Sequence, residues 1–237
     1  MSIYQQILTC KTKGVKLLAI LLDPDKLVVE NLSNLILKIN QSPATHIFIG
    51  GSSFDGNHLD ELIIQLKAQI NLPFLLFPGN PSQISKDADG ILFLTLLSGR
   101  NPDYLIEHQV NAVPIIKKTN LEVISTGYIL IESGNETAVE RVSKTKPLDR
   151  NNHEYALQTA QAGELIGNKL IYLEAGSGAK LSVPEEMITL VAQNIKVPLI
   201  VGGGIRSKQE IENAYKAGAD VVVIGTAFEN DVNFFNS

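Results

Sequence analysis

The stretch LIVGGGIRSKQEIENAYKAGADVVVIGT, residues 199–226, joins two short apolar runs through a glycine turn and a segment with helical spacing. Ser207 is suited to cap that helix, and Glu210 three residues later completes a capping-box pattern. A strand, a helix and a second strand in this order are typical of a βαβ unit with parallel strands. The stretch therefore predicts an α/β fold.

Similar apolar runs, each closed by Gly, Pro or Asp, recur along the chain and are typical of strands buried on both faces of a parallel sheet. We identify eight, at residues 17–22, 46–49, 74–77, 91–94, 128–131, 170–173, 199–201 and 221–224. Segments with helical spacing lie between them, at residues 27–39, 59–70, 184–195 and 207–217. Eight such units, with no GxGxxG motif after the first strand, favour a (β/α)8 TIM barrel over an open doubly wound sheet. No linker divides the chain, so we predict one domain over residues 1–237.

One unit of the predicted barrel lacks room for its outer helix. Residues 78–90, PGNPSQISKDADG, contain two prolines and two glycines and little apolar periodicity. We therefore expect a barrel whose third outer helix is replaced by a loop. Either neighbouring segments or a partner subunit cover the exposed side, or it forms a groove for a long apolar ligand. Residues 132–150 are predicted to be a loop insertion after the fifth strand.

Composition excludes several classes of function. The net charge of −5 and the absence of Trp argue against a nucleic-acid partner. The single cysteine, Cys10, allows no internal disulfide and fits a cytoplasmic location. The N-terminus lacks a signal-peptide pattern, and no apolar run is long enough to cross a bilayer.

Glycine turns follow the last three predicted strands, and TIM barrels commonly bind phosphate at the loops after the seventh and eighth. Gly203 and Gly204 lead into the capped helix, Gly225 and Thr226 follow the eighth strand, and a Gly-Ser-Gly turn at residues 176–178 follows the sixth. Glycines let the backbone approach an anion, and helix N-termini favour negative charge. Although single glycine turns are usually structural, three at these positions predict a phosphate site.

Four polar side chains are predicted to lie at the same end of the barrel. Glu174 and Tyr172 share one strand face. Glu174 could take a proton from a substrate hydroxyl, or could form an ion pair with Lys or Arg. Asp23 and Ser52 have oxygen donors that suit Mg²⁺, although the Asp-Pro-Asp-Lys turn at residues 23–26 could also simply begin a helix. The four histidines have no metal-ligand spacing.

Seven segments between Leu21 and Phe228 make the chain resemble the geranylgeranylglyceryl phosphate synthase family, including its heptaprenylglyceryl phosphate synthase relatives in bacteria. These segments are LLDPDK, FIGGSS, LSGRNPDYLI, STGYILIESG, LIYLEAGSGA, IVGGGIRS and AGADVVVIGTAF. The first, third and fifth are the most specific, because other phosphate-binding barrels share only the GGGI and final glycine signals.

The resemblance implies a Mg²⁺-dependent prenyltransferase. The C3 hydroxyl of sn-glycerol 1-phosphate attacks C1 of a polyprenyl diphosphate, taken here as geranylgeranyl diphosphate, to give an ether lipid and diphosphate. It implies metal ligands at Asp23 and Ser52 and catalytic roles for Glu174 and Tyr172. It also implies glycerol phosphate contacts at Tyr172, Leu173, Glu174, Ala175, Gly176, Ser177, Gly178, Gly203, Gly204, Gly225 and Thr226.

The resemblance further implies a prenyl groove along the barrel side and a homo-oligomer. We also expect transient membrane contact for lipid exchange. Two positions depart from many family members: Leu21 stands where they have Lys, and Thr226 where they have Asn. Arg100 and Lys26 are then candidates for the diphosphate contact. Two alternatives remain open, a sugar-phosphate isomerase or lyase on the same barrel and a phosphate- or lipid-binding protein without catalysis.

Overall fold

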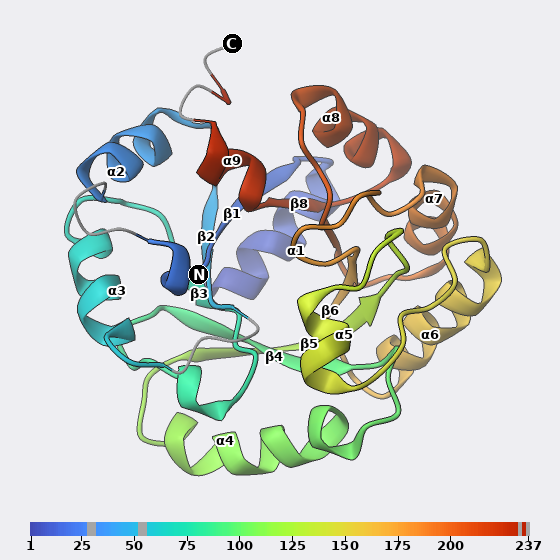
Figure 1. The fold of residues 1–237 in the computed structure, drawn as a ribbon, viewed down its shortest axis with the longest axis horizontal. Coiled ribbons are helices and arrows are strands. Elements are labelled where there is room, and N and C mark those ends of the chain that lie inside the picture. The colour runs from blue at the N-terminus through green and yellow to red at the C-terminus, as the bar shows by residue number, and fades with distance from the viewer. Residues whose placement is uncertain (28–31, 52–55, 232–233, 236–237) are drawn as a thin grey trace.

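Eight parallel strands close into a barrel in sequence order, with β8 pairing back onto β1, in a computed structural model that describes residues 1–27, 32–51, 56–231 and 234–235 (Figure 1). The strands are β1 Leu17–Leu22, β2 His46–Ile49, β3 Phe74–Leu76, β4 Gly90–Leu96, β5 Glu122–Leu130, β6 Leu170–Glu174, β7 Leu199–Gly202 and β8 Val221–Ile224. The predicted (β/α)8 barrel is confirmed. The fourth and fifth strands are longer than predicted. In β5, polar residues between 122 and 127 interrupt the apolar pattern, so only the end of this strand is visible as an apolar run.

The α-helices are α1 Ile3–Lys13, α2 Leu32–Gln41, α3 Leu59–Lys67, α4 His108–Ile116, α5 Ala138–Ser143, α6 His153–Leu165, α7 Glu185–Asn194, α8 Lys208–Ala217 and α9 Thr226–Asn230. Six of them, α2, α3, α4, α6, α7 and α8, form a ring around the barrel, while α1 lies across one end of it (Figure 1). Shorter turns are η1 Pro24–Lys26, η3 Pro81–Gln83 and the π-helical η4 Asp103–Glu107. As predicted, Ser207 caps α8, and its hydroxyl accepts a 3.2 Å hydrogen bond from the Glu210 amide.

No α-helix connects β3 to β4. The described residues 77–89 contain only η3, a single 3-10 turn, so the expected loss of the third outer helix is confirmed. The predicted loop at residues 132–150 is partly wrong. It contains the short helix α5, and Thr137 and Glu140 form a capping box at its start.

The two faces of the strands pack in two separate hydrophobic clusters. One face, with Ile20, Ile171 and Val222 among its residues, packs outward against the helices. The other face, with Phe48, Tyr128 and Tyr172, fills the barrel interior. Alternating side chains on fully buried strands produce this arrangement. Because these side chains fill the barrel interior, a ligand can bind only at the open end, beyond the last interior side chains.

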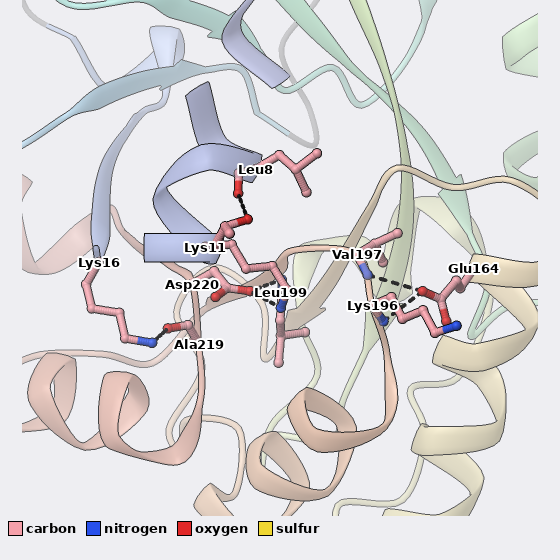
Figure 2. Close-up of polar contacts among 10 residues, drawn as sticks. Leu8, Lys11, Lys16, Glu164, Lys196, Val197, Leu199, Ala219 and Asp220 are labelled. Atoms are coloured by element: carbon pink, nitrogen blue, oxygen red, sulfur yellow. Dashed lines mark hydrogen bonds and ion pairs between the residues drawn. The ribbon is translucent and has the colours of Figure 1, made fainter. Parts of the chain in front are cut away.

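Helix α1 closes the end of the barrel at which the strands begin. The spacing of apolar residues in its sequence does not predict this role. Ile3 and Ile7 enter the interior cluster. The Glu122 carboxylate accepts hydrogen bonds of 2.6 and 2.9 Å from the Ile3 and Tyr4 amides. At the other end of α1, Lys11 forms a 2.8 Å ion pair with Asp220 (Figure 2).

Further polar contacts at the same end fix the starts of the strands (Figure 2). Asp220 also accepts a 2.9 Å hydrogen bond from the Leu199 amide, and Lys16 donates to the Ala219 carbonyl at 2.7 Å. Glu164 of α6 accepts hydrogen bonds from the backbone amides of residues 196 and 197. These contacts stabilise the closed end, which leaves the opposite end for the site.

Candidate active site

The carboxyl ends of the strands surround a cavity of about 460 Å³. The ends of β6, β7 and β8 all contribute to it. Nine of the predicted site residues line this cavity: Asp23, Glu174, Gly176, Ser177, Gly178, Gly203, Gly204, Gly225 and Thr226. Residues far apart in the sequence thus meet at one place, as the fold requires.

Backbone amides line one side of the cavity. Within the described residues, the amides of Ser177, Gly178, Gly203 and Gly204 donate no hydrogen bond. Uncommitted amides at a glycine-rich turn can bind an anion such as phosphate. The Ala175 amide is not available in the same way, because it donates to the Gly202 carbonyl at 3.0 Å.

The turn after β7 requires glycine for two reasons. Gly203 and Gly204 have φ values of +80° and +72°, which disfavour any residue with a Cβ. A Cβ at Gly203 would also lie 2.3 Å from Glu174 Oε1 and 2.5 Å from the Gly176 nitrogen. The backbone of this turn therefore packs directly against the carboxylate and the amide-bearing loop.

Glu174 ends β6 and is only 5% exposed. Its Oε1 accepts a 2.7 Å hydrogen bond from the Gly176 amide. Burial raises the pKa of Glu174 to about 7, while the Tyr172 hydroxyl and the Gly176 amide oppose that rise. A carboxyl group with a pKa near neutrality suits a general base. No Lys or Arg of the described chain forms an ion pair with it, so the alternative ion-pair role is not supported.

Tyr172 lies below Glu174 on the same face of β6, as predicted, and has no exposed surface. A Cβ at Gly202 would lie 2.6 Å from the Tyr172 hydroxyl and 2.7 Å from Glu174 Oε2, so both groups flank Gly202. The hydroxyl has no hydrogen bond of regular geometry within the described chain. Burial, followed by the Glu174 charge, raises the pKa of Tyr172 well above its usual value, so the hydroxyl stays protonated.

Asp23 lies at the end of β1, on the cavity wall. Its carboxylate caps η1 by accepting a 3.2 Å hydrogen bond from the Asp25 amide and forms a 3.3 Å ion pair with Lys26. The helix-start role and exposure to the cavity therefore occur together. Ser52, the second predicted metal ligand, lies outside the described residues.

A second cavity, of about 110 Å³, lies between η3 and α4, on the side where an outer helix is absent. Its wall is mostly apolar and includes Ile84, Leu94 and Ala112. The two cavities share four lining residues: Gly51, Phe77, Tyr128 and Val139. They therefore adjoin, and the apolar cavity is next to the carboxylate and the amides.

Comparison with known proteins identifies the family. The model of the PcrB family matches residues 11–236. The chain belongs to the PcrB family. It is 69% identical over 236 residues to the geranylgeranylglyceryl phosphate synthase of Flavobacterium johnsoniae, covering 100% of this chain and 97% of the relative. It is 42% identical to the enzyme of the same name from Pyrococcus furiosus, covering 93% and 87%.

A solved structure agrees with this membership of the PcrB family. It is the (S)-3-O-geranylgeranylglyceryl phosphate synthase of Thermoplasma acidophilum, in complex with its substrate sn-glycerol-1-phosphate. The TM-score is 0.92 at 33% identity, with 100% of this chain and 95% of the other covered. The resemblance to geranylgeranylglyceryl phosphate synthases that the motifs predicted is therefore confirmed.

Some predicted site residues of this PcrB chain do not line the cavity. Leu173 points outward into the cluster packed by the helices, and Ala175 is fully buried. Their assignment as substrate contacts, like that of Tyr172, stays a prediction. Arg100 lines neither cavity, and its guanidinium donates to the Leu97 and Gly99 carbonyls. This position argues against Arg100 as the diphosphate ligand, whereas Lys26 does line the larger cavity.

Other residues of the site were missed. Phe77 stacks on Tyr172 at a centroid distance of 5.5 Å, and Tyr128 packs edge-on against Tyr172 at 5.4 Å. Phe77 and Tyr128 line both cavities. Arg206 lines the larger cavity and donates to the Ala179 and Lys180 carbonyls at 2.5 and 3.2 Å. Period-two alternation in β5 could have placed Tyr128 inside the barrel.

Proposed function

We propose that the protein is a prenyltransferase that joins sn-glycerol 1-phosphate to a polyprenyl diphosphate, with geranylgeranyl diphosphate as the donor. The observation that carries the proposal is the arrangement of three different surfaces. Uncommitted amides suit a phosphate, Glu174 suits a hydroxyl, and an adjoining apolar cavity suits a prenyl chain. A sugar-phosphate isomerase or lyase would need the first two surfaces but not the third.

The substrate phosphate binds at the amides of residues 177–178 and 203–204, with residues 225 and 226 on the same wall. This places the other end of a three-carbon molecule near Glu174, because the Gly176 amide ties the carboxylate to the same loop. The relative from Thermoplasma acidophilum, which contains sn-glycerol-1-phosphate, supports this choice of ligand.

Glu174 acts as the general base. Its carboxylate accepts the proton of the C3 hydroxyl while the hydroxyl oxygen forms a bond to C1 of the prenyl group. The bond between C1 and the diphosphate oxygen breaks, and the electron pair leaves with diphosphate. Tyr172, protonated and beside Glu174 Oε2, acts through the carboxylate by orienting it.

Mg²⁺ fits the available donors when the diphosphate supplies the remaining ligands. Asp23 is a carboxylate on the cavity wall, and Mg²⁺ is commonly held by one or two carboxylates together with substrate phosphates. Within the described residues there is no group of three or more His, Cys, Asp or Glu that could hold a metal by itself. Asp23 and Ser52 would hold the ion, which supplies positive charge for the leaving diphosphate.

Several other expectations stay predictions: a homo-oligomer, a single domain over residues 1–237 and a cytoplasmic location. The described residues include no helix with the length and apolar character needed to cross a bilayer.

The proposed function is tested by turnover. Purified protein is incubated with Mg²⁺, a C20 prenyl diphosphate and each enantiomer of glycerol phosphate, and products are identified by mass. We expect a prenyl ether with sn-glycerol 1-phosphate, together with release of diphosphate. Isomerisation or cleavage of sugar phosphates without any ether product would contradict the proposal. A series of prenyl donors from C10 to C35 would then define the chain length.

A further inference from the structure

Four apolar side chains are exposed beside the apolar cavity. Ile106 of η4 is 59% exposed, Val110 and Val113 of α4 are 55% and 40% exposed, and Val142 of α5 is 38% exposed. The Tyr104 hydroxyl donates to the Val142 carbonyl at 3.1 Å, which ties the two segments together. We call these four residues the apolar patch.

Three of the four residues of the apolar patch lie on one side of the helical segment formed by η4 and α4. Ile106, Val110 and Val113 are four and three residues apart, so their side chains form a stripe along one side of the helix. About a quarter-turn round the helix from this stripe, Gln109 and Ala112 line the apolar cavity. Helix α4 therefore carries apolar side chains beyond the face that lines the cavity, a pattern typical of a helix whose exposed side is also covered.

Basic side chains lie next to the apolar patch. Arg100, Lys144 and Lys146 line one surface hollow of about 500 Å³, formed by residues 98–102 and 144–146, and no carboxylate contributes to its wall. Asn101 donates to the Ser143 carbonyl at 2.8 Å and so fixes the hollow against the start of η4. The three cations therefore face solvent beside the apolar stripe.

The charge of this region is opposite to that of the rest of the chain. Residues 100–118 and 141–146 contain six Lys or Arg and two Asp or Glu, a net charge of +4. The chain as a whole has a net charge of −5, so all remaining residues together have −9. Apolar side chains among basic ones on an otherwise acidic protein indicate an anionic partner with an apolar interior.

We propose that the apolar patch and the adjoining basic hollow dock the enzyme on an anionic lipid bilayer. This inference rests on the proposed function, in which both the prenyl donor and the ether product are lipids that would exchange through the neighbouring apolar cavity. A second copy of the chain is a weaker candidate. A two-fold interface uses the same patch on both subunits, and it would bring one region of charge +4 against another.

Flotation of the full chain with vesicles tests the proposal. Vesicles of phosphatidylcholine alone are compared with vesicles containing roughly 30% phosphatidylglycerol, a fraction that gives an anionic surface. We expect at least tenfold more bound protein on the anionic vesicles. Raising the salt to about 0.5 M should reduce that binding several-fold, because salt screens exposed charges.

Two double variants separate the charged from the apolar contribution. Lys144→Glu/Lys146→Glu should reduce binding at least tenfold, whereas Lys13→Glu/Lys216→Glu, at exposed lysines on other elements, should not. Val110→Ser/Val113→Ser should also reduce binding. Its matched control is Leu37→Ser/Ile64→Ser, since Leu37 and Ile64 are both 55% exposed on other helices.

Equal binding to neutral and anionic vesicles, or none to either, would overturn the proposal. So would a light-scattering result in which Val110→Ser/Val113→Ser turns an oligomer into a monomer while vesicle binding is unchanged, because the face would then join copies of the chain. Turnover of the C20 prenyl diphosphate in detergent, without vesicles, is measured in parallel. Its absence in the unaltered protein would contradict the proposed function, whereas flotation still reports on docking.

Discussion

Glu174 Oε1 accepts a 2.7 Å hydrogen bond from the Gly176 amide, two residues further along the chain. The carboxylate and the phosphate-binding loop therefore hold each other in place. On the other side, Gly203 lies so close that a Cβ there would be 2.3 Å from the same oxygen. A base and an anion site built from shared contacts can bind the two ends of one small substrate at a fixed separation.

Replacing the carboxylate should slow the chemical step. Glu174→Gln has almost the same shape, and its amide oxygen can still accept from Gly176, but it cannot take a proton. We expect kcat to fall by a factor of about 10²–10⁴, with a smaller change in KM for glycerol phosphate. Steady-state kinetics measures both values, and Glu61→Gln on the exposed face of α3 is the control. A near-normal kcat in Glu174→Gln would remove its role as base.

The rate should depend on the ionisation of Glu174. Burial raises the pKa of this carboxyl to about 7, and a base acts only when deprotonated. We therefore expect kcat/KM to be level above about pH 8 and to fall about tenfold per pH unit well below pH 7. The profile of the residual activity of Glu174→Gln is the control. If that variant keeps the acidic limb, the limb belongs to a substrate phosphate rather than to Glu174.

The glycine at residue 203 should not tolerate a methyl group. Gly203→Ala puts a Cβ against Glu174 and the Gly176 amide, at a φ of +80°. We expect a loss of stability of about 1–3 kcal/mol and a much larger loss of activity. Gly14→Ala is the matched control, because Gly14 has a φ of +68° with nothing near its Cβ position. Equal kcat/KM in the two variants would show that the close approach at Gly203 is unimportant.

Much of the barrel could be predicted from the sequence because its strands are buried on both faces. Each such strand appears as a short apolar run, and the ordinal position of a run then places its last residue at the mouth. This reasoning placed Glu174, Gly203 and Gly225 together without any tertiary information. The loss of the third outer helix was equally visible in the prolines and glycines of residues 78–90.

The remaining features depend on contacts that local patterns do not encode. Helix α1 closes the barrel through Glu122 and Asp220, which are more than 100 residues away in the sequence. Arg206 follows the glycine turn and looks like a surface residue, yet its guanidinium binds carbonyls of another loop. Tyr128 was read as the start of a strand, although β5 begins six residues earlier and brings Tyr128 to the mouth.

Arg206 should affect substrate binding more than chemistry. Its guanidinium holds the carbonyls of Ala179 and Lys180, at the end of the loop that supplies the Ser177 and Gly178 amides. In Arg206→Ala we expect KM for glycerol phosphate to rise roughly tenfold, equivalent to about 1.4 kcal/mol, with a smaller change in kcat. Arg206→Lys keeps one donor and should recover part of the loss. An equal KM in all three proteins would contradict an anchoring role.

His46 should make the fold sensitive to acid. The residue is 4% exposed, its Nδ1 lies 2.8 Å from Thr45 Oγ1, and its Nε2 has no partner within the described chain. Burial lowers the pKa of His46 from 6.5 to about 4. The unfolded chain therefore binds this proton more readily than the folded one. Stability from neutral His46 is complete above pH 6.5 and is lost as the pH falls toward 4.

The expected loss is about 2 kcal/mol between pH 6.5 and 4.5, measured as the free energy of unfolding in urea. His46→Gln should lose correspondingly less over this interval, even if it is less stable at every pH. Both proteins keep Glu174, whose raised pKa makes an opposite contribution that cancels in the comparison. His58→Gln, at a side chain that is 84% exposed, should follow the unaltered protein. Parallel pH dependences for the unaltered protein and His46→Gln would show that His46 is not the group that the fold keeps neutral.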